Sequence, residues 1–366
     1  MLFRSNAAAW VAGGRVEGVY GKQRLPNYAV FDEMRYFSAG TEGLVATAGG
    51  HQVGVVICED AWSEGGPARD AAGQGAGVVA CLSASPYYQG KQAVRQETFA
   101  RLCRRNQIWF LYANLVGGQD ALVFDGASWV MNPGGDVVAR AKAFEEDLLV
   151  VELDGAAVRR IEGVEPRPLD RTAEVYSALV LGVRDYVEKN GFSGVVLGLS
   201  GGIDSALTAA VAVDAVGAEH VTAVVMPSRY SSEETQADAR IIARNLGARQ
   251  IELPIEGPHR AFEAELAPVF ADVEGDPENL TDQNVQARIR AVYLMALSNK
   301  LGLLVLNTSN KSESAVGYGT LYGDMVGGFA AIQDVFKTQV WELARYVNDR
   351  AGREILPARV IERVPS

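Results

Sequence analysis

The sequence predicts two α/β parts joined by a linker. Up to about residue 153, short apolar runs punctuated by glycine indicate the strands of a mixed sheet with few long helices between them. From residue 172 onward, strand and helix patterns alternate regularly, which predicts βαβ units and a doubly wound parallel sheet. Between these parts, residues 154–171 contain two glycines and two prolines among charged residues, a composition typical of a linker.

In the first part, Ala7–Val11 and Arg15–Tyr20 predict a strand pair around the turn Ala12-Gly13-Gly14, so the chain is expected to begin inside a sheet. The clearest helix is Gln92–Arg105. The other expected strands of this part are Val53–Ile57, Val78–Leu82, Ile108–Ala113, Ala127–Met131 and Leu148–Val151.

The second part opens with Thr172–Asn190, whose apolar residues recur at helical spacing. The elements expected after it, in chain order, are the strand Gly194–Leu199, the helix Asp204–Val216, the strand Val221–Met226, the helix Glu233–Leu246, the strand Gln250–Leu253, the helix Asp282–Leu301 and the strand Leu303–Leu306. Ligands of parallel sheets bind at the carboxyl ends of the strands, so the loops that follow these strands are the expected site.

Composition narrows the functional classes. The formal net charge of −11 argues against a general nucleic-acid binder, and no apolar stretch approaches a membrane span or a signal peptide. Cys58, Cys81 and Cys103 show no CxxC spacing, which favours a reduced, cytoplasmic protein. The three scattered histidines make a zinc site or a histidine-dependent triad a poor expectation.

One loop carries a strong chemical signal. The segment Ser200-Gly201-Gly202-Ile203-Asp204-Ser205 runs from a predicted strand into a helix. Its glycines expose N–H groups, Ser200 and Ser205 add hydroxyls, and the helix start adds a positive dipole end, so the loop can hold an anion. Asp204 would repel phosphate unless Mg²⁺ lies between them. A plain glycine-rich βα turn is the alternative, but the six-residue string in this context favours phosphate binding.

This loop resembles the SGGxDS loop of the N-type ATP pyrophosphatases, which grips the pyrophosphate released when ATP adenylates a substrate. Residues 172–366 as a whole resemble the synthetase domain of NAD synthetases, a Rossmann-like fold of the adenine nucleotide alpha hydrolase type. The segments that carry this resemblance are Glu278–Arg290, Asn307–Glu313, Gly319–Asp324 and Asp334–Thr338.

The resemblance implies roles for individual residues. Mg²⁺ would be held by Asp204 and Glu313, and deamido-NAD by Asn284, Arg288, Arg290, Thr320 and Asp324. ATP and its pyrophosphate would contact Ser200, Gly201, Gly202, Asp204, Ser205, Met226, Arg229, Thr308 and Lys337. From spacing alone, the two arginines could equally lie on a solvated helix face, and Glu313 could be an exposed carboxylate at a helix start. Phe336 stands where the family usually has proline, which could alter the loop that orients Lys337.

The first part carries a candidate nucleophile. Cys58 ends an apolar strand, and Lys22 lies in Gly21-Lys22-Gln23-Arg24-Leu25-Pro26-Asn27-Tyr28. These segments resemble the nitrilase superfamily, an αββα sandwich in which a Glu–Lys–Cys triad hydrolyses amides, and which serves as the glutaminase domain of NAD synthetases. The implied glutamine pocket is Tyr28, Glu59, Ser85 and Arg95. A buried structural cysteine is the alternative for Cys58 and the expectation for Cys81 and Cys103.

Two departures from the family are visible. Only 21 residues precede Lys22, and none is a plausible triad glutamate; the chain also stops at Pro365-Ser366, where the family continues. We therefore expect a chain truncated at both ends, in which glutaminase activity is uncertain.

The leading functional hypothesis is ATP-dependent amidation of deamido-NAD through an adenylated intermediate, with ammonia supplied from glutamine and release of AMP and pyrophosphate. The family also suggests a homo-oligomer. Three alternatives remain: another ATP-pyrophosphatase amidotransferase such as GMP or asparagine synthetase, a carbon–nitrogen hydrolase with a regulatory nucleotide-binding module, and a fragment that only binds nucleotide or assembles with complete subunits.

Overall fold

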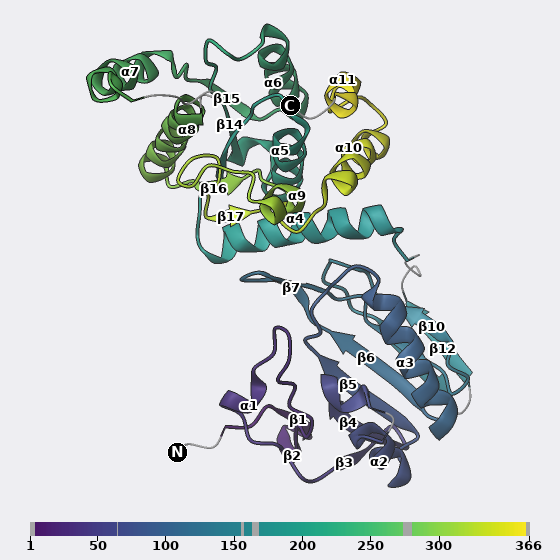
Figure 1. The fold of residues 1–366 in the computed structure, drawn as a ribbon. Helices are drawn as coiled ribbons and strands as arrows, with labels where there is room; N and C mark the ends of the chain where they lie inside the picture. Colours follow the sequence, from purple (N-terminus) through teal and green to yellow (C-terminus); the bar gives the residue numbers. More distant parts are fainter. Residues whose placement is uncertain (1–3, 64, 155–156, 163–167, 274–279, 364–366) are drawn as a thin grey trace. The chain divides into compact units, whose positions relative to one another are not determined.

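The computed structural model describes residues 4–63, 65–154, 157–162, 168–273 and 280–363. The chain divides into two compact units, which are described separately below (Figure 1). The first unit is Met1–Gly117 with Leu122–Arg171, and the second is Gly118–Ala121 with Thr172–Ser366.

A six-stranded mixed sheet forms the centre of the first unit, with the strand order β10-β9-β6-β5-β4-β3. Its three middle strands, β4 (His51–Ile57), β5 (Val78–Ser83) and β6 (Trp109–Asn114), are parallel and correspond to three of the predicted apolar runs. The antiparallel flanking strands are β3 (Leu44–Ala48), β9 (Trp129–Met131) and β10 (Val137–Arg140). Strand β9 begins two residues later than predicted because Ala127 has a φ of 48°, which is incompatible with a strand.

One face of this sheet packs against α2 (Pro67–Gly73) and α3 (Lys91–Asn106), the latter confirming the predicted helix. Aromatic rings fill the interface: the Phe99 ring of α3 stacks on Phe110 with centroids 5.0 Å apart, and Tyr112 stacks on Trp129 at 5.0 Å. A short 3₁₀ turn, η1 (Cys58–Ala61), follows β4, and α1 (Glu33–Tyr36) precedes the sheet. This packing fixes the carboxyl ends of β4 and β5, where Cys58 and the turn at Ser85 lie.

Three strand pairs lie outside the main sheet. The first, β1 (Ala7–Ala12) with β2 (Arg15–Gly21), confirms the predicted pair at the start of the chain. The others are β7 (Val116–Gln119) with β8 (Leu122–Asp125), and β11 (Val150–Asp154) with β12 (Ala157–Glu162). Strand β12 falls in the range that was expected to be linker, so part of that range is sheet.

The second unit is built on a five-stranded parallel sheet with the order β15-β14-β13-β16-β17. Its strands are β13 (Val195–Gly198), β14 (Val221–Val225), β15 (Arg249–Glu252), β16 (Leu304–Asn307) and β17 (Phe329–Ala330). The chain leaves β13 in one direction and returns to β16 on its other side, so the topological switch point lies between β13 and β16. This confirms the doubly wound sheet, and such sheets bind ligands at that point.

Helices cover both faces of this sheet. Val195 and Leu197 of β13 point into a core with α5, whereas Val196 points into a core with Ile289 and Leu294 of α8. The helices of the unit are α4 (Arg171–Lys189), α5 (Ile203–Val216), α6 (Glu233–Leu246), α7 (Glu256–Phe270), α8 (Leu280–Leu301), α9 (Lys311–Val316), α10 (Lys337–Ala351) and α11 (Ala358–Glu362), with a 3₁₀ turn at Ala218–His220. Helices α7, α9, α10 and α11 were not predicted.

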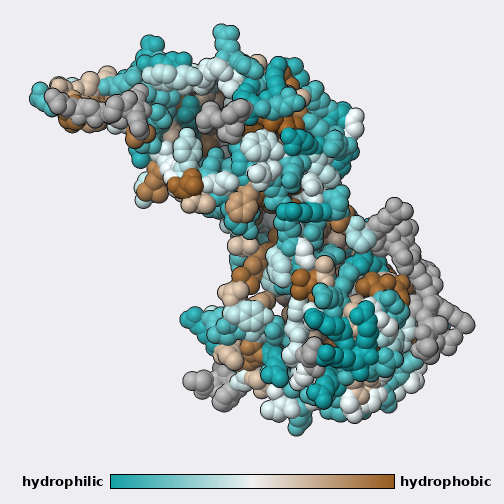
Figure 2. Space-filling view, turned by 45° about the vertical axis from the view of Figure 1, so that its right-hand side comes forward, coloured by the Kyte–Doolittle hydropathy of each residue, from teal (hydrophilic) through white to brown (hydrophobic). Residues whose placement is uncertain are grey.

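Hydrophilic residues dominate the face of the molecule shown in Figure 2, where apolar residues form small separate patches. Among the helices that the structure describes, none combines the length and the apolar character that crossing a membrane requires.

Candidate active sites

The predicted phosphate loop lies directly after β13 and opens α5, with Gly202 as the N-cap residue. Hydrogen bonds that involve its own hydroxyl groups hold the loop together. The Ser205 hydroxyl donates to the Gly202 carbonyl at 3.0 Å and lies 3.1 Å from the Ser200 hydroxyl, which accepts from the Gly202 N–H at 3.2 Å. The loop is thus already held in one conformation, which lowers the entropic cost of binding an anion.

Gly201 is required by the way this loop packs. Its φ is 82°, and a Cβ atom at this position would lie 2.1 Å from the backbone carbonyl oxygen of Thr235. Only glycine therefore lets the loop approach the first turn of α6.

A cavity of about 360 Å³ opens at the carboxyl ends of the strands. Most of the predicted nucleotide-site residues line it: Ser200, Gly202, Asp204, Ser205, Met226, Arg290, Thr308, Glu313 and Asp324. Ser231, Thr235, Gln236 and Tyr318 also line it and were not predicted. The start of α6 follows β14 at the same edge of the sheet, and this position is the signal that could have pointed to Ser231, Thr235 and Gln236.

Asp204 and Glu313 line this cavity from the first turns of two helices, α5 and α9. Asp204 accepts a hydrogen bond from the Asn310 side chain at 3.0 Å and pairs with the Lys337 ammonium. Glu313 forms a capping box with Asn310 at the start of α9. Burial raises the pKa of the Glu313 carboxyl, and the charge of Asp204 raises it further, whereas the Asn310 N–H and Lys337 lower it. Glu313 is therefore part of the cavity as well as a helix-start residue.

This donor set fits Mg²⁺. The ion is usually held by one or two carboxylates together with substrate phosphates, and a divalent cation would relieve the repulsion between Asp204 and Glu313. The neighbouring Ser200–Ser205 loop is the segment that the sequence predicts to hold phosphates.

The unusual Phe336 leaves Lys337 in contact with Asp204. Phe336 has a φ of −66°, which proline also adopts, and it is the N-cap residue of α10. The Lys337 N–H donates to the Ser312 hydroxyl at 3.0 Å, and its ammonium reaches Asp204.

The residues predicted to bind deamido-NAD lie on α8 and on the segment after α9, and several of them contact each other. The Thr320 hydroxyl donates to Asn284 at 2.7 Å and its N–H to Asp324 at 2.6 Å. Arg288 is exposed and donates to the carbonyl of Leu321 at 3.2 Å. The start of the predicted segment, residues 278–279, lies outside the described residues.

Arg290 lines the cavity itself. Its Nε donates to the carbonyl of Met226 at 3.2 Å, and burial lowers the pKa of its guanidinium while Asp324 raises it. Arg290 therefore faces the cavity, in contrast to a solvated helix position.

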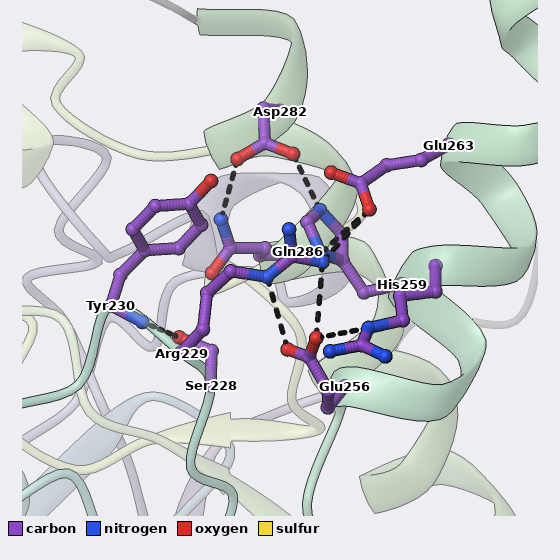
Figure 3. Close-up of polar contacts among 9 residues, drawn as sticks. Ser228, Arg229, Tyr230, Glu256, His259, Glu263, Asp282 and Gln286 are labelled. Carbon is purple, nitrogen blue, oxygen red and sulfur yellow. Dashed lines mark hydrogen bonds and ion pairs between the residues drawn. The ribbon is translucent and has the colours of Figure 1, made fainter.

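Arg229 does not line the cavity. Its guanidinium lies among side chains of α7, 2.8 Å from Glu263 and 3.1 Å from Glu256, as Figure 3 shows. This arrangement was not predicted from the sequence, because α7 itself was not predicted.

In the first unit, the nucleophile candidate Cys58 follows the last residue of β4 and has a φ of 44°. This left-handed conformation turns the chain sharply, as the sequence predicted for a presented thiol. Burial raises the pKa of the Cys58 thiol, and the Lys22 ammonium lowers it. Lys22 and Cys58 thus share one site.

Lys22 is only 2% exposed and pairs with Glu33 at 2.5 Å. Glu33 lies downstream of Lys22, whereas the family resemblance implies a triad glutamate upstream. The Lys22 segment is fastened to the turn after β4 by the fully buried Asp60, which accepts the N–H groups of Gln23 at 3.1 Å and Arg24 at 2.7 Å. Glu33 and Asp60 were both missed from the sequence.

The predicted glutamine pocket has an outer and an inner part. The exposed Tyr28 donates to Glu59 at 3.0 Å. Ser85 and Arg95 are buried, and Arg95 donates to the Ser85 carbonyl at 2.9 Å while pairing with the buried Asp125 at 2.7 Å. Arg95 therefore holds the turn at Ser85 from behind.

A second cation near Cys58 was missed. The ammonium of Lys91, at the start of α3, lies 4.9 Å from the ring centroid of Tyr88 and 5.8 Å from that of Trp62. Burial lowers the pKa of Lys91, and its charge lowers the pKa of Cys58. A single lysine at the start of a helix matches no known motif, so the sequence offered no signal that would point to Lys91.

The other two cysteines are structural, as expected. Cys81 and Cys103 are buried, and burial raises the pKa of each to about 12. Neither thiol is therefore set up for nucleophilic chemistry.

Comparisons with known proteins match each unit to a family. Residues 3–162 match the carbon-nitrogen hydrolase family, and residues 175–366 match the NAD synthase family. The glutamine-dependent NAD(+) synthetase of Thermotoga maritima is 45% identical, covering 99% of this chain and 68% of the relative. That of Acinetobacter baylyi is 48% identical, covering 99% and 66%. The chain thus spans about two thirds of the length of these relatives.

A solved structure agrees as well. The glutamine-dependent NAD+ synthetase of Acinetobacter baumannii, in complex with ADP, matches with a TM-score of 0.94 at 46% identity, over 100% of this chain and 69% of that one. A nitrilase-like unit with a cysteine and a lysine in one site and a parallel-sheet unit with a phosphate loop both lie within the matched length. The chain therefore belongs to the glutamine-dependent NAD(+) synthetases, ligases that amidate deamido-NAD with ATP and ammonia from glutamine.

Proposed function

We propose that the cavity of the second unit carries out the ATP-dependent step, in which deamido-NAD is adenylated and then amidated. One observation carries this proposal: the Ser200–Ser205 loop, which is held by its own hydrogen bonds and includes Asp204, shares a single cavity with Glu313 and Arg290. That combination can hold phosphates, a divalent cation and a second anionic substrate together.

In this proposal each side chain binds or orients. Ser200, Gly201, Gly202 and Ser205 hold the pyrophosphate, with Thr308 and Lys337 beside them. Met226 flanks the adenosine of ATP, with Arg229 further along the same loop and outside the cavity lining, while Asn284, Arg288, Arg290, Thr320 and Asp324 hold deamido-NAD. Mg²⁺, held by Asp204 and Glu313, would neutralise the charge that develops on the phosphates. The nicotinate carboxylate attacks the α-phosphorus of ATP and expels pyrophosphate; ammonia then attacks the acyl carbon, AMP leaves, and the nitrogen loses its extra proton.

For the first unit we propose glutamine hydrolysis at Cys58. The Cys58 thiolate attacks the side-chain amide carbon of glutamine, ammonia leaves after protonation, and water cleaves the thioester to glutamate. Lys22 lies close enough to lower the pKa of Cys58, and Asp60 holds the Lys22 segment in place. Tyr28 and Ser85 complete the pocket, with Arg95 holding the turn of Ser85.

The pocket also offers partners for both charged ends of a free amino acid. Glu59 can accept the α-ammonium, and Lys91 can bind the α-carboxylate. Glu59 directly follows Cys58 in the chain, and the charge of Lys91 lowers the pKa of the Cys58 thiol.

The test of the ATP-dependent step uses ammonium as nitrogen donor. The chain should release AMP and pyrophosphate only when ATP and deamido-NAD are both present. Asp204→Ala should abolish this release, whereas Asp349→Asn, an exposed residue of α10, should not. Release of AMP by Asp204→Ala at the wild-type rate would reject the proposal.

Two further points are proposals of the same kind. We propose a cytoplasmic location, supported by three free, buried cysteines. A homo-oligomer stays a prediction, which sedimentation of the chain would check.

A further inference from the structure

A polar network lies behind the wall of the nucleotide cavity. It contains Arg229 from the loop after β14, Glu256, His259 and Glu263 from α7, and Asp282 and Gln286 from α8 (Figure 3). His259 is fully buried, and it is the one buried side chain of α7. The contacts of α7 within this network are all polar.

The hydrogen bonds of this network have a defined direction. Arg229 Nη2, which can only donate, lies 3.4 Å from His259 Nδ1, so Nδ1 accepts. His259 Nε2 therefore carries the proton and donates to Asp282 at 2.5 Å. The other oxygen of Asp282 accepts from Gln286 at 2.9 Å. The result is one continuous path from the β14 loop through α7 to α8.

The positive charge that balances the carboxylates of this network is the guanidinium of Arg229. His259, Glu263 and Asp282 each place a potential metal ligand atom within 4.8 Å of the others. Arg229, however, lies 2.8 Å from Glu263 and pairs with Glu256. A metal ion would have to displace this arginine from two carboxylates, so the geometry favours a structural network over a metal centre.

The network joins two of the elements that line the cavity, the loop after β14 and α8. Met226 and Pro227 line it from the β14 loop and directly precede Ser228-Arg229 in the chain. On α8, Asp282, Gln286 and Arg290 follow one another at intervals of four residues, so they lie along one side of the helix. Arg290 lines the cavity and donates to the carbonyl of Met226 at 3.2 Å. The β14 loop and α8 are therefore connected at two places: directly between Met226 and Arg290, and through His259 between Arg229 and Asp282.

We infer that His259 and Asp282 are positioning residues for the adenosine half of the nucleotide site. They act through Arg229 and α8 by fixing the separation between Met226–Pro227 and Arg290. The Ser200–Ser205 loop is fastened by its own hydroxyls, so pyrophosphate binding does not depend on this network. The inference rests on the proposed function, in which adenosine lies beside Met226.

The test measures two ligands separately by isothermal titration of the full chain in the presence of Mg²⁺: AMP and inorganic pyrophosphate. His259→Leu and Asp282→Asn should each weaken AMP binding by about tenfold, because they leave buried polar partners unpaired. Pyrophosphate affinity should stay within about twofold in both. His259→Gln, which keeps a donor toward Asp282, should restore part of the AMP affinity. His220→Leu, at an exposed histidine outside the network, should change neither ligand.

The two titrations distinguish a failure of the role of His259 and Asp282 from a failure of the proposed function. Retained pyrophosphate binding shows that a variant is folded. Unchanged AMP affinity in both His259→Leu and Asp282→Asn, or equal weakening of AMP and pyrophosphate, would overturn the inference while leaving the proposed function intact. A wild-type chain that binds neither ligand would overturn both.

Discussion

The two sites of this chain are built in opposite ways. In the second unit, the phosphate loop consists of backbone groups and hydroxyls within six consecutive residues, held by hydrogen bonds among themselves. In the first unit, charged side chains far apart in sequence are buried together: Lys22 with Glu33, and Asp60 with the backbone of Gln23 and Arg24. A site of the first kind tolerates changes around it, whereas one of the second kind depends on every partner.

The largest effect is expected at the point where the phosphate loop has no steric freedom. Gly201→Ala would place a Cβ atom 2.1 Å from the Thr235 carbonyl oxygen. The loop must then move, so we expect pyrophosphate affinity to fall by about a hundredfold or more. Titration calorimetry measures this directly.

Gly191→Ala is the matched control for Gly201→Ala. Gly191 also has a positive φ, 70°, but nothing lies within 4 Å of the position that its Cβ atom would take. The substitution should cost about 1–2 kcal/mol of stability without affecting the ligand. If Gly191→Ala and Gly201→Ala lost pyrophosphate binding equally, the loss would come from the positive φ of the substituted residue. The contact with Thr235 would then not explain it.

A smaller but still large effect is expected for Asp60→Asn. The amide cannot accept all the hydrogen bonds that the carboxylate accepts from Tyr20, Gln23, Arg24 and Ile57. The Lys22 segment should loosen, and we expect Cys58 to react about tenfold more slowly with an electrophilic glutamine analogue. Mass spectrometry of the labelled protein measures the rate.

Asp70→Asn, at an exposed position of α2, controls for the loss of a negative charge. It should leave the labelling of Cys58 unchanged. Wild-type labelling of Cys58 in Asp60→Asn would mean that Lys22 is positioned without Asp60.

The contrast between the sites also explains what the sequence could predict. The strand β13, the predicted phosphate loop and α5 follow one another in the chain, so one local motif predicted this part of the structure and indicated a chemistry for it. Asp60, Glu33 and Lys91 are ordinary charged residues in the sequence, and their importance arises from burial and long-range contacts. Helix α7 was not predicted, because it buries a single side chain, His259, and so lacks the broad apolar face by which a helix is recognised in a sequence.

Alkylation of the cysteines should depend on pH in a selective manner. Burial raises the pKa of the Cys58 thiol, so its thiolate fraction and its rate of reaction with iodoacetamide should increase as the pH rises through the neutral and mildly alkaline range. Cys81 and Cys103, each with a pKa of about 12, should stay unmodified. Lys22→Met should slow Cys58 further, because Lys22 favours the thiolate. Equal labelling of Cys58 and Cys81 in the native protein would contradict this assignment.

The smallest effect is expected for Phe336→Pro. The φ of −66° suits proline, and the exposed Phe336 ring contacts the Lys311 ammonium at 4.9 Å. We expect a change in unfolding free energy of at most about 1 kcal/mol and an unchanged affinity for pyrophosphate. Thermal unfolding with a parallel titration checks both. A clear loss of pyrophosphate binding would mean that Phe336 helps to orient Lys337.

The division of labour between the two units is tested most directly by NAD formation in Cys58→Ala and Asp204→Asn, each supplied with glutamine or with ammonium. Cys58→Ala should lose the reaction with glutamine and retain it with ammonium. Asp204→Asn should lose both. Substantial NAD formation from ammonium by Asp204→Asn would contradict the assignment of the ATP-dependent step to the Ser200–Ser205 cavity.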